Sequence, residues 1–191
     1  MAKIYLMRHG ETNYNVEERM TGRGSDPELT NHGKSQANLV GASLKTEYQI
    51  SYIVSSNMTR TNQTAEIINQ HLGLDIHYDN EIQEKDKGGL EGTLISESLP
   101  IILTLKDDET HPVYGGESDA IFRNRIVNAL CKYLISEEEA ILLVSHGFVG
   151  TMAARTFLNV DTNFNNAHFM TLDPEQIPDL AGKCSFDCST S

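Results

Sequence analysis

Short apolar runs and longer segments with helical spacing alternate along this chain. Apolar runs bounded by polar or turn-forming residues predict strands at residues 3–7, 52–55, 75–79, 140–145 and 168–172. A period of 3.6 residues predicts helices over 31–46, 58–72 and 118–135, and a further helix after residue 147 that ends near residue 158. Strands that alternate with helices in this way are typical of α/β proteins.

Local signals sharpen several of these boundaries. Thr30 has the side chain of a helix N-cap, and Gly73 is a suitable C-cap. The helix over 118–135 is predicted to bury a face that includes Ile121 and Phe122. We therefore expect a three-layer α/β domain with a mostly parallel sheet and helices on both faces. One domain is expected over residues 1–191, with an irregular tail from about residue 174.

Composition and charge limit the classes of molecule that this chain can bind. The chain has 191 residues, 39% hydrophobic and 22% charged, and a formal charge of −12. That charge argues against nucleic acid, which needs a clustered cationic surface, but leaves room for a small anionic substrate held by a few local cations. No apolar stretch is long enough to span a bilayer. Oligomeric state is not indicated.

The cysteines and the start of the chain predict a cytoplasmic location. The apolar start is too short, and interrupted too early by Arg8, to be a secretory signal. Three cysteines without such a signal favour a reducing compartment. Cys184 and Cys188 have the spacing of metal ligands, but no second ligand pair is evident. We interpret these two residues as free thiols in a polar tail.

Two of the predicted strands end in the same way. His9 follows the first strand and His146 follows the strand at 140–145, each with glycine next. A lone histidine is more often a solvated or core side chain, but ligands in open parallel sheets bind at the carboxyl ends of strands. Arg8 and Arg60 lie near such ends, and a guanidinium binds phosphate oxygens in a bidentate manner. The four side chains therefore predict an anion site.

Five blocks of sequence carry a more specific signal. The first contains Arg8-His9-Gly10-Glu11-Thr12, Asn15, Arg19, Thr21-Gly22, Leu29-Thr30 and Gly33. The others are Ser55-Ser56 with Arg60-Thr61 and Gln63-Thr64-Ala65, Glu84 with Gly88-Gly89-Leu90-Glu91-Gly92, Gly115-Gly116-Glu117-Ser118 with Arg123 and Arg125, and Val144-Ser145-His146-Gly147. In content and order these blocks resemble the histidine phosphatase superfamily, also called the phosphoglycerate mutase-like family. A single Arg-His-Gly triplet is weak evidence, whereas five ordered blocks are strong.

The resemblance implies a role for each matching residue. His9 is expected to attack phosphorus through one ring nitrogen, while the other donates a hydrogen bond to a backbone carbonyl. Arg8, Arg60 and His146, with the backbone N–H of Gly147, would stabilise the transferred phosphoryl group, and Glu84 would be the general acid. The matching positions Asn15, Thr21 and Gly22 would contact phosphate or substrate. Neither a metal nor a cofactor is implied.

Hydrolysis is the reaction we predict. The stretch between Glu84 and His146 is shorter than in the mutases of the family, so less cover is available to shield phosphohistidine from water. The expected enzyme is a phosphoric monoester hydrolase for a small phosphorylated metabolite, similar in size to α-ribazole phosphatase and phosphosugar phosphatases. Two alternatives stay open at this point: a phosphoglycerate mutase-type isomerase and a non-catalytic protein that binds a phospholigand.

Overall fold

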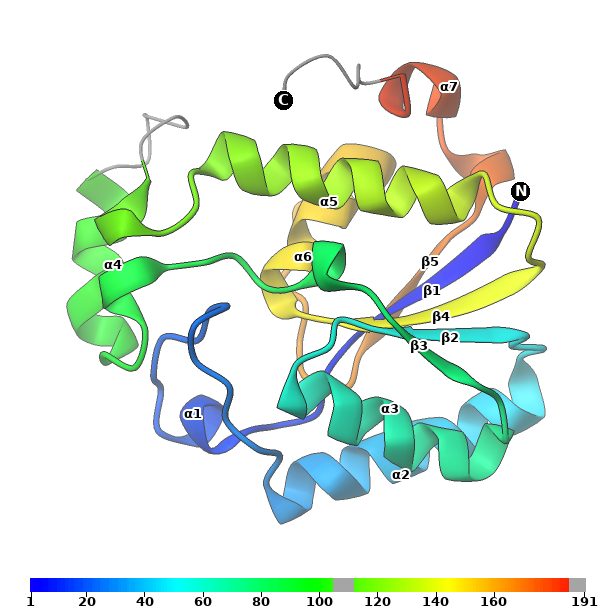
Figure 1. Ribbon diagram of the computed structural model, residues 1–191, viewed down its shortest axis with the longest axis horizontal. Coiled ribbons are helices and arrows are strands. Elements are labelled where there is room, and N and C mark those ends of the chain that lie inside the picture. Colours follow the sequence, from blue (N-terminus) through cyan, green and yellow to red (C-terminus); the bar gives the residue numbers. More distant parts are fainter. Residues whose placement is uncertain (105–111, 186–191) are drawn as a thin grey trace.

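A five-stranded sheet forms the centre of the molecule (Figure 1). The computed structural model describes residues 1–104 and 112–185. Four strands are parallel, and the last runs antiparallel to the first. The strands in the spatial order β3-β2-β4-β1-β5 are Ile76–Tyr78, Tyr52–Ser55, Ala140–Ser145, Lys3–Arg8 and Phe169–Leu172. This arrangement confirms the mostly parallel sheet predicted from the sequence.

Helices cover both faces of the sheet (Figure 1). In β1, Ile4 and Leu6 belong to the core on one face, and Tyr5 and Met7 belong to the core on the other. Successive side chains of a strand point to opposite faces, so an apolar strand contributes to both cores. One face carries α2 (Asn31–Glu47) and α3 (Thr59–Leu72); the other carries α5 (Asp119–Leu134) and α6 (Gly147–Ala153), which continues as a π-helix over Ala154–Leu158.

The predicted helix ends agree with the structure at the capped positions. The Thr30 side chain accepts a hydrogen bond from the backbone N–H of Gly33 at 3.0 Å, and Gly73 ends α3 with φ 70°. The prediction was wrong for Ile121, which is 61% exposed. The buried stripe of α5 begins at Phe122, so its neighbour in the first turn faces solvent.

Short elements join these layers. They are α1 (Asn13–Val16), α4 (Ile95–Thr104), α7 (Leu180–Lys183) and the 3₁₀ turns Asn80–Ile82, Gly88–Leu90, Val113–Gly115 and Pro174–Gln176. The tail predicted as irregular therefore contains a turn and α7, and Pro174 and Ile177 in it are buried. Within residues 1–104 and 112–185, no helix has both the length and the apolar character needed to cross a membrane.

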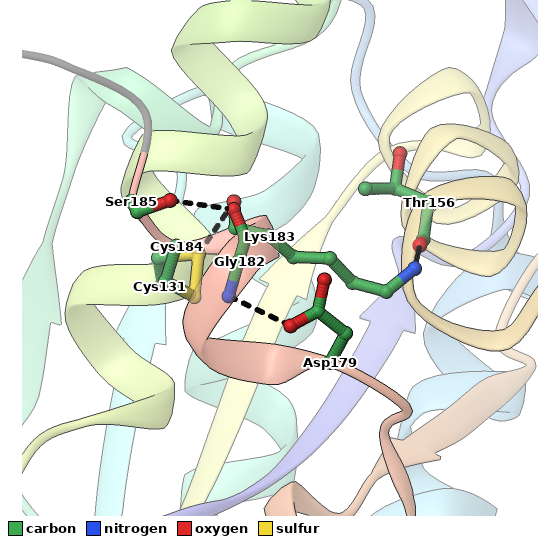
Figure 2. The surroundings of a disulfide bond; sticks show 7 residues. All are labelled: Cys131, Thr156, Asp179, Gly182, Lys183, Cys184 and Ser185. Carbon is green, nitrogen blue, oxygen red and sulfur yellow. Dashed lines mark hydrogen bonds between the residues drawn. A yellow bond between two sulfur atoms is a disulfide. The ribbon is translucent and has the colours of Figure 1, made fainter.

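A disulfide corrects the interpretation of the cysteines. Cys184, which directly follows α7, is bonded to Cys131 on α5 across a sequence separation of 53 (Figure 2). The free-thiol prediction for Cys184 was wrong because it considered only the local spacing to Cys188, which lies outside the described residues. The buried tail brings Cys184 to α5, and Lys183 anchors it further by donating to the Thr156 carbonyl (Figure 2). The cysteines no longer favour a reducing compartment, and a cytoplasmic location stays a prediction.

Candidate active site

The two strand-end histidines lie side by side. Strands β1 and β4 pair so that Arg8 is opposite Ser145, and the backbone N–H of His9 donates to the Ser145 carbonyl at 3.0 Å. His9 and His146 each follow one member of this pair, and their ring centroids are 5.4 Å apart. Both side chains are buried. Parallel pairing of two distant segments thus produces the predicted convergence.

One nitrogen of His9 is kept available. Nδ1 is 2.7 Å from the carbonyl oxygen of Gly10, and because a carbonyl only accepts, Nδ1 carries the hydrogen. Nε2 then holds the lone pair, and it has no hydrogen-bond partner among the residues described. Burial lowers the pKa of the His9 imidazole well below its usual value, and the charges of Arg60 and Arg8 lower it further. The ring is therefore neutral at neutral pH, as a nucleophile requires.

His146 is held by both of its ring nitrogens. Arg60 Nε lies 3.3 Å from Nδ1 and can only donate, so Nε2 carries the hydrogen and donates to Ser56 Oγ at 2.6 Å. Ser56 in turn lies 2.9 Å from the hydroxyl of Thr61. Burial, followed by the charge of Arg60, lowers the pKa of His146 well below its usual value. The structure thus fixes a neutral imidazole next to His9.

Arg60 is a fully buried cation wrapped by one loop. Its exposed fraction is 0%, and its guanidinium donates to the carbonyls of Ser25 at 2.8 Å and Gly22 at 3.0 Å. Asp26 forms an ion pair with it at 3.3 Å. Gly22, predicted to contact phosphate or substrate, does not line the pocket described below; in this structure its carbonyl holds Arg60.

Arg8 presents an unpartnered donor beside His9. Its Nη1 donates to the Phe164 carbonyl at 2.8 Å, whereas its Nε is buried and has no hydrogen-bond partner within the described chain. A Cβ placed on Gly147 would lie 3.4 Å from this guanidinium, so the start of α6 packs closely on Arg8. Buried donors without a partner are rare in folded proteins. An anion bound next to His9 would satisfy this one.

Glu84 is positioned by backbone N–H groups. Its carboxylate accepts from the N–H of Lys85 at 2.8 Å and from that of Phe148, in the first turn of α6, at 3.3 Å. The side chain is buried, and it lines the same pocket as His9. A carboxyl group in this place can exchange a proton with the oxygen of a bound phosphate ester.

A buried ion pair holds the segment that carries Glu84. Arg125 donates to both carboxylate oxygens of Glu117, at 2.9 and 2.8 Å. The same guanidinium donates to the carbonyls of Glu81 at 2.6 Å, Gln83 at 3.0 Å and Glu84 at 3.4 Å. The sequence showed Arg125 and Glu117 only as parts of one block. Their contact with the segment that carries Glu84 could not be predicted, because nothing in the spacing indicates which carbonyls the guanidinium faces.

These groups surround a pocket of about 450 Å³. Of the predicted residues, it is lined by Arg8, His9, Asn15, Thr21, Glu84 and Gly147, while Arg60 and His146 lie behind its wall. Six lining residues are apolar, a feature that the sequence analysis missed: Met20, Ile95, Leu99, Ile102, Phe148 and Phe164. Within the described residues, no group of three or more His, Cys, Asp or Glu side chains is placed to hold a metal ion.

Two of the predicted contact residues have part of their polar groups already engaged. Asn15 Oδ1 accepts from the Thr12 N–H at 3.0 Å and from Asn166 at 3.1 Å, which leaves the Asn15 amide hydrogens for a ligand. The Thr21 carbonyl accepts from Lys87 Nζ at 2.7 Å. Burial lowers the pKa of Lys87, and the charge of Glu84 opposes this effect.

Known proteins with similar sequences or folds include one named a probable mutase and one named a phosphatase. The sequence profile of the histidine phosphatase superfamily, branch 1, matches residues 4–175. A probable phosphoglycerate mutase, GpmB, of Salmonella paratyphi A is 36% identical over 171 residues, and the match covers 84% of this chain and 76% of the relative. A mycobacterial glucosyl-3-phosphoglycerate phosphatase of known structure is 26% identical in sequence and superposes with a TM-score of 0.77. The superposition covers 92% of this chain and 94% of the phosphatase chain. Bacillus stearothermophilus YhfR has the same identity and TM-score over 91% of each chain.

Proposed function

The chain belongs to the histidine phosphatase superfamily, and on this basis we propose that it is a phosphomonoesterase that hydrolyses a small phosphorylated metabolite through phosphohistidine on His9. The observation that carries the proposal is the state of the His9 ring. Its Nδ1 hydrogen is committed to the Gly10 carbonyl, and its Nε2 lone pair has no partner in the described residues. Next to it, Arg8 Nε is a buried donor that lacks an acceptor there.

The first chemical step follows from this arrangement. Nε2 of His9 attacks phosphorus, the bond to the ester oxygen breaks, and Glu84 transfers its proton to that oxygen. Charge on the phosphoryl oxygens is stabilised by the free donor of Arg8 and, through its positive charge, by Arg60 behind the pocket wall, while the neutral His146 ring accepts from Arg60 and holds it there. Loss of one such donor typically costs about a hundredfold to a thousandfold in rate.

The second step regenerates the enzyme. Glu84, now a carboxylate, accepts a proton from water, whose oxygen attacks phosphorus as the bond to Nε2 breaks. Inorganic phosphate then leaves and His9 is neutral again. In a mutase, a hydroxyl of the substrate would take the place of this water. The mutase is the second candidate because GpmB, a relative at 36% identity, is named a probable phosphoglycerate mutase. The short cover between Glu84 and His146 supports hydrolysis.

Phosphate release from 4-nitrophenyl phosphate tests the first claim. We expect His9→Ala to abolish it and His32→Ala, which changes an exposed histidine on α2, to leave it unchanged. Equal rates for wild type and His9→Ala would refute the phosphohistidine step. Glu84→Gln should slow esters of poor leaving groups far more than the nitrophenyl ester, because nitrophenolate leaves without a proton.

A second assay separates hydrolysis from isomerisation. The enzyme is incubated with 3-phosphoglycerate and a bisphosphoglycerate primer, and both 2-phosphoglycerate and free phosphate are measured. Hydrolysis predicts that phosphate accumulates, whereas formation of 2-phosphoglycerate without phosphate would assign the chain to the mutases. Binding of phosphate esters without either product would support a non-catalytic protein.

A further inference from the structure

We infer that the preferred substrates of this site are phosphate monoesters of apolar alcohols, whose organic group packs against one face of α4. The inference deepens the proposed phosphatase function and rests on it. It depends on three observations: the side chains that α4 presents to the pocket, the way in which α4 is fixed to the phosphate-binding end, and the partners of the cations in the pocket.

Helix α4 contributes an apolar stripe to the pocket. Ile95, Leu99 and Ile102 all line it, and their spacing of four and then three residues places them on one side of the helix. Ile95 and Leu99 are 40% and 46% exposed, a large exposure for apolar side chains in a wall. Phe148 and Phe164 extend the wall. A polar glycerate or sugar would leave this surface in contact with water.

The first turn of α4 is fixed to the segment that follows the nucleophile. The backbone N–H of Ile95 donates to the Glu18 carbonyl at 2.8 Å, and Arg19 forms a β-bridge with Leu94. The N–H of Met20, itself a pocket residue, donates to the Thr93 carbonyl at 2.8 Å. The apolar stripe therefore has a defined position relative to His9, and Figure 1 shows α1 and α4 at the same end of the sheet.

The cations that line the pocket have protein partners. Arg19 pairs with Glu17 at 2.6 Å and donates to the Gly92 carbonyl at 2.8 Å. Lys87 donates to the Thr21 carbonyl, and its ammonium lies 4.3 Å from the centre of the Phe148 ring. Arg8 lies beside His9 and is assigned to the phosphate. A second anionic group on the substrate, such as the carboxylate of a phosphoglycerate, would compete with these contacts, whereas an alkyl or aryl group would not.

A homologous series of 1-alkyl phosphates isolates this contact. From propyl to hexyl the alkanol leaving groups have nearly the same basicity, so the chemistry is constant while the apolar contact grows. Each buried methylene contributes about 0.8 kcal/mol at full burial, which is about fourfold, and about twofold at half burial. We expect kcat/KM for phosphate release to rise about eightfold to sixtyfold over the three added methylenes. The probes are the alkyl phosphates themselves, with sn-glycerol 3-phosphate and 3-phosphoglycerate as polar comparisons.

Matched variants assign the effect to the stripe. The double variant Leu99→Gln/Ile102→Gln should flatten the rise to less than about threefold over the series, because amide side chains replace the apolar contact. The ratio compares substrates on one enzyme, so it does not depend on how much of the variant is folded. Leu103→Gln is the control: this residue is on the same helix and 57% exposed, but it does not line the pocket, and the wild-type ratio should persist.

The outcomes separate the two levels of the argument. A flat series in the wild type, an equal rise in the double variant, or higher kcat/KM for the polar esters than for hexyl phosphate would overturn the apolar preference. His9-dependent release from 4-nitrophenyl phosphate would still stand in each case. Absence of any His9-dependent phosphate release would instead overturn the proposed function, and the inference with it.

Discussion

Substitution of Arg125 tests two effects that can be measured separately, one on the stability of the fold and one on the rate of phosphate release. Its guanidinium binds the Glu117 carboxylate in a bidentate manner and also donates to three carbonyls of the segment that ends at Glu84. The side chains of the pair are 9% and 7% exposed. Replacement by methionine would leave a buried carboxylate without its partner and would release the acid segment.

The expected cost of Arg125→Met follows from this burial. Removal of one partner from a buried ion pair costs about 3–5 kcal/mol of the free energy of unfolding, because the remaining charge is not compensated. In Arg125→Met/Glu117→Leu that charge is absent too, and the cost falls to the lost bonds to carbonyls, about 1–3 kcal/mol in total. Both variants lose the donors that position Glu84.

Two measurements are needed. Urea denaturation gives the free energy of unfolding from the midpoint, provided that the slope is unchanged. Phosphate release from an alkyl phosphate and from 4-nitrophenyl phosphate, measured without urea, gives the dependence on the leaving group. We expect both variants to lose at least tenfold more kcat on the alkyl ester than on the nitrophenyl ester. Arg155→Met, which breaks the exposed pair with Asp161, is the control and should change stability by less than about 1 kcal/mol.

Two results would contradict these expectations. A loss of stability no greater than that of Arg155→Met would show that the Arg125 pair does not support the fold. Parallel losses on the two esters, with stability affected as expected, would show that Arg125 stabilises the protein without positioning the acid.

Three further outcomes follow from the structure. The disulfide between Cys131 and Cys184 closes a loop with a sequence separation of 53, so Cys131→Ser should lower the free energy of unfolding by about 4 kcal/mol, and a reductant should lower the urea midpoint of the wild type but not of this variant. His9 and His146 have folded-state pKa values well below 6.5, so the unfolded chain binds more protons below that pH. The contribution of the two neutral histidines to the free energy of unfolding is therefore complete above about pH 6.5 and is lost as the pH falls towards their folded-state pKa values. A urea midpoint that is no lower at about pH 5 than at about pH 7.5 would contradict this linkage. Gly33→Ala would press a methyl group onto the backbone of Glu11, two residues after His9, and should lower kcat by up to about a hundredfold, whereas an unchanged kcat would show that this close packing does not position the His9 ring.

The features that could be predicted from the sequence are those that depend on a local residue pattern or on the position of strand ends. The strands at 3–7 and 140–145 had strong apolar signals, and parallel sheets bring their carboxyl ends together, so the convergence of His9 and His146 could be foreseen. The Cys131 pairing could not be, because it depends on a tail that packs through only a few apolar residues such as Ile177. The prediction that Ile121 is buried was wrong because periodicity indicates which side of a helix faces the core but not how far along the helix that buried side extends.

The apolar wall escaped prediction because it is built from a short helix, the start of α6 and distant loops. Ile95, Leu99 and Ile102 have helical spacing, but apolar residues at that spacing usually face a protein core. In this protein they border a pocket instead, since α4 is fixed through backbone hydrogen bonds to the segment near Met20. Such bonds between main-chain atoms carry no signature in the identity of the side chains.

The pairing of β1 with β4 has a consequence for how this protein can change over evolutionary time. Because adjacent backbones in a sheet keep a spacing of about 4.8 Å whatever side chains they carry, the two histidine backbones stay neighbours for as long as the sheet is kept. The wall contributed by α4 has no such constraint. Descendants of this chain can therefore drift toward new molecules by changing a few exposed positions, while the pair of histidines at the strand ends is passed on unaltered.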